Sequence, residues 1–342
     1  MEESNNVKLS EREIVGAYSV DRNGHYIDGE NFLSNLKYLK VPNSLNNINL
    51  NAGEYDDGGE SYDPMERLNF MTDYIKQNST KFVKNERIDA DFVCFRGGLK
   101  NIMSSPYLEN DWIVKAVKLK ETIYFILELK GYENKNDISK SFGFKFESYM
   151  VASKPYLEPP GASLPVYKRE EFCVLMSRKV DDYKILFGAE IDGVNSKSVI
   201  GTLDELKTSN LIEIKLRKYK EGPNKLDANR SIEWWCQSCI ASVDIIHVGI
   251  HDQGVIKNLE TLQTKKLQHK YSPWSRSECI KQLKKLLTYI KDKMEEIDDP
   301  KIGLSFEWKG KSKEFADIKV IEGFLPLKYI EFINKLKPNK EL

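Results

Sequence analysis

Apolar residues recur every three or four positions in four parts of the chain, which is the spacing of one face of an α-helix. Phe142, Phe146 and Tyr149, for example, lie at i, i+4 and i+7. The ranges in which this spacing predicts helices are Met65–Gln77, Ile138–Ala152, Ser231–Ala241 and Ser275–Ile297.

Short runs rich in Val, Ile, Phe and Tyr predict β-strands from residue 91 onward. Two of these runs are separated by a short polar turn, as in a hairpin. The first ninety residues are weakly periodic, and the acidic stretch Glu54–Glu60 predicts a solvated loop. The predicted strands are Asp91–Arg96, Trp112–Leu119, Thr122–Leu129, Phe172–Val180, Lys184–Val194, Leu211–Lys218, Val243–Ile250, Ile302–Trp308 and Phe315–Ile321.

The predicted helices and strands follow one another without a convincing linker between them. The 342 residues fit one large domain or two ordinary ones, at about 100–200 residues each. We therefore predict a single mixed α/β domain over residues 1–342, with mixed β-sheets flanked by helices.

Composition excludes several classes of protein. Hydrophobic residues make up 40% of the chain, which excludes wholesale disorder, and no apolar run approaches the ~20 residues of a membrane span. The N-terminus lacks the apolar core of a signal peptide, and the five cysteines are an odd number, so we expect a reducing, intracellular location. With 52 basic and 52 acidic residues, the chain is not expected to coat nucleic acid with bulk positive charge.

Two pairs of charged residues have the strand spacing that places both members of a pair on one face. Glu190 and Asp192 are two residues apart in Gly188–Gly193, and Glu213 and Lys215 are two residues apart in a later strand. Alternate residues of a strand point to the same face, so the apolar neighbours of each pair point into packing. If the two strands are neighbours, three acids and one lysine meet in one patch.

Three carboxylates beside a lysine are suited to a reaction at phosphate. Mg²⁺ and Mn²⁺ prefer carboxylate oxygens and promote phosphodiester hydrolysis, while a lysine supplies positive charge to the phosphate. An acid followed by Glu-x-Lys resembles the catalytic core of PD-(D/E)XK nucleases, with Asp192, Glu213 and Lys215 in those positions. The alternative is that both pairs lie on solvated strand faces, because 30% of the residues are charged.

Five short motifs follow one another between about residues 91 and 260. They are an arginine after a strand, Gly-Φ-x-Φ-Glu on a helix, Glu-Φ-Asp, Glu-Φ-Lys, and a glutamine after two tryptophans, where Φ is hydrophobic. They occupy Phe95–Gly97, Gly143–Glu147, Glu190–Asp192, Glu213–Lys215 and Trp234–Ser238. In this order they resemble the DXO family of decapping exoribonucleases, which implies a PD-(D/E)XK-nuclease-like core.

The resemblance implies a metal site. Glu190, Asp192 and Glu213 would bind one or two Mg²⁺ or Mn²⁺ ions, together with the backbone carbonyl of Ile214. Glu147 would complete the site, partly through a water molecule. All of these acidic residues are present, which argues against a degenerate relative without activity.

The resemblance also implies contacts with substrate. Lys215 and Gln237 would contact the scissile phosphate or the attacking water, and Arg96 would bind the 5′ end of the RNA. The implied catalytic set is Glu147, Glu190, Asp192, Glu213, Lys215 and Gln237.

Members of this family hydrolyse defective RNA 5′ ends. The resemblance therefore implies a hydrolase in mRNA 5′-end quality control, acting on triphosphorylated, incompletely capped or NAD-capped RNA, with 5′-to-3′ exoribonuclease activity in some members. One alternative is a PD-(D/E)XK nuclease that cleaves DNA, and another is a non-enzymatic partner that stabilises a 5′-to-3′ exoribonuclease. We expect a nuclear location, with the cytoplasm as the alternative, and no membrane association.

Two features of the motifs have structural interpretations. Gly143, one helical turn before Glu147, is expected to let its helix approach a sheet closely. At least one of Trp234 and Trp235 is expected in the core, with Gln237 facing the site.

Four residues are of the types that bind zinc in proteins, namely Cys236, Cys239, His247 and His251. Seven residues separate Cys239 from His247, fewer than the ~12 of a two-Cys two-His finger. We assign these residues to packing, with zinc binding as the alternative.

Overall fold

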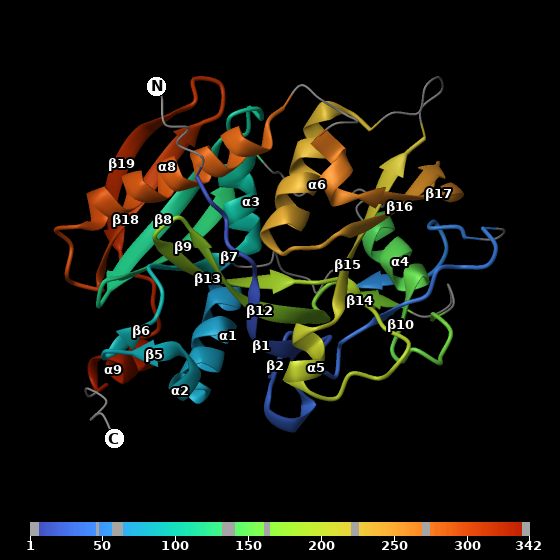
Figure 1. The fold of residues 1–342 in the computed structure, drawn as a ribbon, viewed down its shortest axis with the longest axis horizontal. Helices are drawn as coiled ribbons and strands as arrows, with labels where there is room; N and C mark the ends of the chain where they lie inside the picture. Colours follow the sequence, from blue (N-terminus) through green and yellow to red (C-terminus); the bar gives the residue numbers. More distant parts are fainter. Residues whose placement is uncertain are drawn as a thin grey trace.

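A computed structural model describes residues 7–45, 48–56, 64–131, 141–160, 165–219, 226–268 and 274–336. Within these residues the strands form a nine-stranded sheet, a six-stranded sheet and two small two-stranded sheets. Figure 1 shows the two large sheets next to each other, with helices packed on them. The predicted mixed α/β architecture is confirmed, and the extension of one domain over residues 1–342 stays a prediction.

The nine-stranded sheet is antiparallel except at its centre, where β7 is parallel to both of its neighbours. The predicted hairpin is confirmed as the antiparallel pair β8–β9. The spatial order is β19 (Glu314–Glu322), β18 (Ile302–Lys309), β8 (Trp112–Leu119), β9 (Thr122–Leu129), β7 (Phe92–Phe95), β13 (Tyr183–Glu190), β12 (Glu171–Val180), β1 (Glu13–Val20) and β2 (Tyr26–Ile27).

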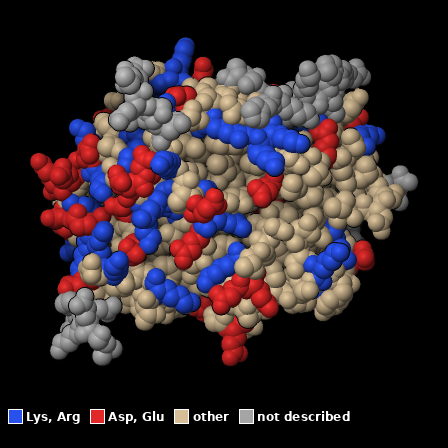
Figure 2. Space-filling view, viewed as in Figure 1, with Lys and Arg blue, Asp and Glu red and all other residues tan. Residues whose placement is uncertain are grey.

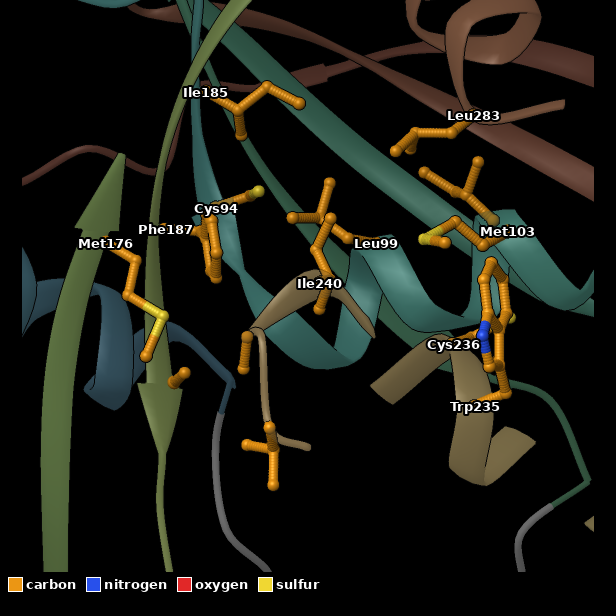
Figure 3. Packing of buried hydrophobic residues seen from close by; sticks show 14 of the residues in the cluster. Cys94, Leu99, Met103, Met176, Ile185, Phe187, Trp235, Cys236, Ile240 and Leu283 are labelled. Carbon is orange, nitrogen blue, oxygen red and sulfur yellow. The ribbon is translucent and has the colours of Figure 1, made fainter. Parts of the chain in front are cut away.

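Helices cover both faces of this sheet, because its central strands are apolar on both sides. In β9, Ile123 and Phe125 pack with the helices α3 (Arg96–Ser104) and α8 (Arg276–Met294). Tyr124, between them, points to the other face and packs with α1 (Pro64–Gln77) and α9 (Leu327–Asn334). Figure 3 shows the first of these cores, where Leu99 and Met103 of α3 lie near Leu283 of α8.

The six-stranded sheet lies between two helices. Phe146 of α4 (Ser141–Met150) packs with Ile212 and Ile214 on one face, and Trp235 of α6 (Ala228–Ile240) packs on the other face. The strand order is β10 (Val151–Ala152), β3 (Tyr38–Leu39), β14 (Gly193–Asn195), β15 (Asn210–Lys218), β16 (Ile245–Asp252) and β17 (Val255–Gln263).

The remaining described elements are short. Of all the helices in the described ranges, none combines the length and the apolar composition that crossing a membrane requires. The short elements are η1 (Gly29–Asn31), η3 (Thr264–Lys266), α2 (Ser79–Phe82), α5 (Leu203–Lys207), the pair β4 (Tyr55–Asp56) with β11 (Val166–Tyr167), and the pair β5 (Val83–Lys84) with β6 (Arg87–Ile88).

Most predicted elements occur within one to three residues of the predicted bounds, but the single strand Lys184–Val194 is wrong. The chain leaves the larger sheet after Glu190 and enters the smaller one at Gly193. A Cβ at Gly193 would lie 2.8 Å from the carbonyl oxygen of Lys37, so only glycine permits this close approach. The two large sheets therefore meet at the residues between these strands.

The sequence pattern also missed several elements, of which the longest are α3, β1, β17 and α9. Arg96 begins α3 instead of ending a strand, and the two following glycines weaken the local helical signal. Packing of the apolar face of α3 in the core stabilises the helix in spite of them. Strands β1 and β17 were not predicted either. Residues 57–60 of the predicted acidic loop and 138–140 of a predicted helix lie outside the described residues.

Candidate active site

Three strands bring the predicted acids to the junction of the two large sheets. Glu190 ends β13, and Gly193 of β14 pairs with Ile212 of β15, so the condition set for the acids to meet is fulfilled by β14 and not by β13. Asp192 lies between β13 and β14, and its Oδ2 accepts a hydrogen bond from the backbone N–H of Ile214 at 2.5 Å. The N–H and C=O of a strand residue point to the same side, so the Ile214 carbonyl also points toward Asp192.

Glu213 is the buried centre of the site, with no exposed surface. Its carboxylate accepts hydrogen bonds from Arg96 Nη1 at 2.7 Å, from Lys215 Nζ at 2.5 Å and from Gln237 Nε2 at 2.5 Å. Burial opposes ionisation of this carboxyl group, but the charges of Arg96 and Lys215 outweigh burial and hold the pKa of Glu213 below its usual value. Glu213 is therefore an ionised, triply hydrogen-bonded carboxylate.

Two further acids have the opposite electrostatic environment. Burial, followed by the charge of Glu213, raises the pKa of Asp192 to about 7. Burial and the charge of Asp192 raise the pKa of Glu147 well above its usual value. Among the described residues, Glu147 makes no hydrogen bond or ion pair. The site thus holds more carboxylates than its own cations neutralise, and a further cation would favour their ionised forms.

A cavity of about 440 Å³ lies beside these acids and includes Glu147, Glu190 and Asp192 in its lining. Carboxylate oxygens are the donors that Mg²⁺ and Mn²⁺ prefer, and these three carboxylates line the cavity, so these residues fit such an ion. Within the described ranges, however, no three Asp, Glu, His or Cys side chains converge closely enough to enclose a metal ion. Basic side chains hold several of the carboxylates instead.

Arg67 of α1 is one of these basic residues, and the sequence analysis missed it. Its Nη2 contacts Glu171 Oε1 and lies 3.0 Å from Glu190 Oε2. Glu171 begins β12 and is only 6% exposed. Arg67 and Glu190 are 123 positions apart, and Arg67 looks like any other charged residue of an amphipathic helix, so no local pattern indicates the contact.

Arg96 holds the other side of the site. Its Nη1 pairs with Glu213, and its Nη2 donates to the backbone oxygen of Glu190 at 2.6 Å. The residue is 7% exposed. In this structure the Arg96 guanidinium is therefore a buried counter-ion of the acids.

Helix α6 positions Gln237. Asp227 caps its first turn by accepting from the backbone N–H of Arg230. At the other end, Arg178 donates to the carbonyl oxygens of Cys239 and Ile240 in the last turn, where its positive charge is favourable. Both tryptophans of α6 are buried, so the prediction of at least one in the core is confirmed.

Helix α4 positions Glu147, but the expected role of Gly143 is wrong. A Cβ at Gly143 would meet nothing within 4 Å. The close approach occurs at Gly249 of β16, where a Cβ would lie 2.5 Å from the ring of Phe146. The glycine that allows α4 to pack closely on the sheet is therefore Gly249 of the sheet itself. Gly249 leaves space for the ring of Phe146, and Glu147 is the next residue of α4.

The zinc-like residues have other partners. The thiol of Cys236 is buried and hydrogen-bonds with Cys279, and burial raises its pKa well above the usual value. Nδ1 of His251 accepts a hydrogen bond from the backbone N–H of Gly254 at 3.1 Å. His247 lies in β16 and is 8% exposed. These contacts are typical of packing residues.

The chain is similar in sequence to a family of known nucleases. The family model described as RAI1 like PD-(D/E)XK nuclease matches residues 11–330. The decapping and exoribonuclease protein Rai1 of Drosophila melanogaster is 27% identical over 320 residues, covering 85% of this chain and 83% of that protein. The decapping nuclease dom-3 of Caenorhabditis elegans is 29% identical over 271 residues, covering 74% and 67%.

Solved structures have the same fold. Candida albicans Rai1 in complex with pU5-Mn²⁺ superposes with a TM-score of 0.77 at 16% identity, covering 97% of this chain and 98% of that one. Scheffersomyces stipitis Rai1 in complex with (3′-NADP)⁺ and calcium ion superposes with a TM-score of 0.75 at 14% identity, with the same coverage. The matched span includes all five motifs and both sheets, and the chain belongs to the RAI1-like PD-(D/E)XK nuclease family.

Proposed function

We propose that this chain is a divalent-metal-dependent hydrolase of RNA 5′ ends. The observation that supports it most is the convergence of Glu147, Glu190 and Asp192 on one cavity, beside the cluster formed by Lys215 and Gln237. The names of the relatives describe decapping nucleases, and one solved relative holds a uridine pentanucleotide with Mn²⁺. The substrate class proposed here is RNA with a triphosphate, an incomplete cap or an NAD cap.

The acids are proposed to hold one or two Mg²⁺ or Mn²⁺ ions. Glu147, Glu190, Asp192, Glu213 and the carbonyl of Ile214 supply hard oxygen ligands. When bound, such an ion neutralises negative charge on the phosphate and lowers the pKa of a coordinated water. For the metal to bind, the Glu190 and Glu213 side chains must share their carboxylates with the metal and their present cations.

Lys215 is proposed to act as a positive donor to the phosphate. Burial opposes its ammonium form, but the carboxylates of Glu213, Asp192 and Glu147 raise the pKa of Lys215 above its usual value. The side chain therefore stays protonated at neutral pH and does not accept a proton from water. Its charge stabilises the negative charge that develops on the phosphate during hydrolysis.

Gln237 is proposed to orient the attacking water. Its Nε2 donates to Glu213, which holds the amide plane in place and leaves its Oε1 as an acceptor. A water that donates to this oxygen would be held beside the carboxylate cluster. Positioning of this kind lowers the entropy cost of the attack.

A second cavity of about 480 Å³ extends from Glu190 and suits a nucleotide. Its wall includes Phe95, Phe125 and Phe144, and its charged residues are Arg67, Lys168, Glu128, Glu171 and Glu190. Its volume lies in the range of about 300–1,000 Å³ that is typical of small-molecule sites. Aromatic side chains stack on bases, and guanidinium groups bind phosphate. We propose that the first nucleotide of the RNA enters here.

The site assignment is tested by replacing single acids. Asp192→Ala and Glu190→Ala are expected to abolish Mn²⁺-dependent hydrolysis while the unfolding temperature stays close to that of the wild type. The matched control is Asp317→Ala, because Asp317 is exposed on β19, away from the site. Full activity in either site variant, at the level of the control, would refute the assignment.

The substrate class is tested with a panel of nucleic acids. RNAs with a 5′-triphosphate, an unmethylated cap or an NAD cap are each incubated with Mg²⁺ and with Mn²⁺, and the released products are identified by mass. We expect pyrophosphate from the first RNA and a dinucleotide or nucleotide cap from the others. Cleavage of duplex DNA in preference to all three RNAs would favour the DNA nuclease.

The stabilising-partner alternative makes a different prediction. A double variant of Glu190 and Asp192 would then still stimulate a 5′-to-3′ exoribonuclease from the same cell. The two roles are compatible, so this assay decides the partner role and the RNA panel decides the enzymatic one. The nuclear location stays a prediction that imaging of the tagged protein tests.

A further inference from the structure

Three basic side chains on α3 and β15 lie near one another, and two of them already have carboxylate partners among the site acids. Arg96 pairs with Glu213 and also donates to the Glu190 backbone. Lys215 pairs with the same Glu213 carboxylate at 2.5 Å. A phosphate entering the site must compete with these ion pairs for both side chains. The third basic residue is Lys100.

Lys100 follows Arg96 by one helical turn, so both residues lie on the same side of α3. The helix packs against α6, and Figure 3 shows Leu99 and Met103 of α3 near Trp235 of α6. The Lys100 ammonium interacts electrostatically with Glu233, Lys215 and Arg96. It therefore lies where α3, α6 and β15 meet, next to the two cations that pair with Glu213.

Glu233 connects this position with the catalytic machinery. It precedes Gln237 by four residues on α6, so the two side chains share a helix face. Gln237 reaches Glu213 from that face. Lys100 thus adjoins the same face of α6 from which Gln237 enters the site.

Within the described ranges, Lys100 makes no ion pair and no hydrogen bond, although it is half-buried. Burial disfavours its charged form, and the positive charges of Lys215 and Arg96 add to that effect, so the pKa of Lys100 lies below its usual value in spite of Glu233. An anion bound next to this ammonium would favour its charged form and raise the pKa of Lys100. Lysine binds phosphate as a point charge with three donors.

The surface charge makes a single contact of this kind important. On the face shown in Figure 2, acidic and basic side chains are interspersed over the half that carries α8, β18 and β19. The chain as a whole has no net charge. RNA bound by this chain would therefore be held by a few local contacts at the site and not by a uniformly basic surface.

We propose that Lys100 binds a phosphate group of the RNA substrate on the α6 side of the site. The inference rests on the proposed function and adds a substrate-binding residue that lies outside the five family motifs. In the structure Arg67, Arg96 and Lys215 all contact carboxylates of the site, so Lys100 is the basic residue of this group that a phosphate of the RNA can reach without competing with an ion pair.

The test measures RNA binding by fluorescence anisotropy in Mn²⁺. The probe is a 3′-fluorescein-labelled pentaribonucleotide with a 5′-monophosphate and phosphorothioate linkages that resist cleavage. We compare the wild type with Lys100→Met, Lys100→Gln and Lys100→Arg at several salt concentrations. The matched control is Lys281→Met, because Lys281 is exposed on α8 and pairs with Glu278 at 3.2 Å.

Lys100→Met and Lys100→Gln are expected to raise Kd about tenfold, the usual effect of losing one charged contact. They should also reduce the slope of log Kd against log salt by about 0.7, the value for one phosphate contact on a single strand. Lys100→Arg is expected to keep Kd within about threefold of the wild type, because it retains the charge. The control should match the wild type.

Unchanged Kd and salt slope in Lys100→Met and Lys100→Gln would overturn the proposal. An arginine variant that binds as weakly as the methionine variant would overturn it as well, because the role would then depend on shape and not on charge. If the wild type itself neither binds nor hydrolyses RNA, the proposed function fails. If the wild type binds and hydrolyses RNA and the uncharged variants match it, only the role of Lys100 fails.

Discussion

Replacing Arg96 by methionine tests the interpretation of this residue as a buried counter-ion. The substitution removes the 2.7 Å pair with Glu213 and the 2.6 Å hydrogen bond to the Glu190 backbone. Breaking a buried ion pair by removing one partner costs about 3–5 kcal/mol, because the other charge stays buried. Lys215 and Gln237 still donate to Glu213, so we expect the lower end, a loss of about 3 kcal/mol.

Thermal unfolding of the metal-free protein measures this loss. An unfolding entropy of about 2.1 cal/mol/K per residue over 342 residues converts 3 kcal/mol into a fall in Tm of about 4 °C. The control Arg230→Met should lower the unfolding free energy by less than about 0.5 kcal/mol. Arg230 is exposed, and its Nε lies 3.7 Å from Asp227 at the surface.

A double variant distinguishes the unpaired charge from simple loss of packing. Adding Glu213→Gln to Arg96→Met replaces the buried carboxylate by a neutral amide, so most of the lost stability should return. A loss below about 1 kcal/mol in Arg96→Met would refute the reasoning, because it falls well short of the cost of a broken buried pair. Failure of the double variant to recover stability would show that the unpaired Glu213 charge is not the cause.

Three further predictions concern pH, metal and packing. The pKa of Asp192 is about 7 in the fold against 3.8 for the free group, so its contribution to stability is present below about pH 4 and is lost as pH rises through 7. In denaturant titration of the metal-free protein, the stability of the wild type should therefore fall between pH 5 and 7 by about 2 kcal/mol more than that of Asp192→Asn, in which Glu147 still contributes. A fall of the same size in Asp192→Asn would contradict this origin. Mn²⁺ should bind more tightly at pH 8 than at pH 6 in calorimetric titration, because protonated carboxyl groups of Asp192 and Glu147 must lose their protons before they bind the metal. An affinity independent of pH would contradict the raised pKa values. Gly249→Ala should destabilise the fold by about 1–3 kcal/mol, because the added Cβ would contact Phe146. Gly143→Ala should stabilise the fold by about 0.5–1 kcal/mol, because a Cβ there meets nothing. Equal effects of the two variants in denaturant titration would contradict the assignment of the close approach to Gly249.

Much of the local structure was predictable because strand and helix periods are local properties. The hairpin of β8 and β9 follows from two apolar runs around a short turn, and the predicted helix Ser231–Ala241 corresponds to α6. The weak points were places where tertiary contacts override local preference. Helix α3 carries Gly97 and Gly98 in its first turn, and only its packing in the core explains it.

The site shows the same division. The spacing of Glu190 and Asp192 predicted a shared strand face, yet the strand breaks between them, and each acid reaches the site from a different sheet environment. The two acids still line one cavity, because the chain turns from one sheet into the other at this point. The residue types were therefore predictable, but the backbone that presents them was not.

The sequence by itself determined the acids, the lysine and the glutamine of the site, together with the mixed α/β class, because each of these lies in a short motif or a periodic segment. Only the tertiary structure decided which cation holds which acid. Arg96 and Glu213 are 117 positions apart, and Arg67 and Glu190 are 123 positions apart. Such contacts depend on the order of strands in the sheets and on which face each helix covers, and a local pattern of apolar and polar residues carries no information about either. For the same reason, nothing in the sequence indicated that Arg96 pairs with Glu213, or that Lys100, one turn further along α3, makes no ion pair or hydrogen bond within the described ranges.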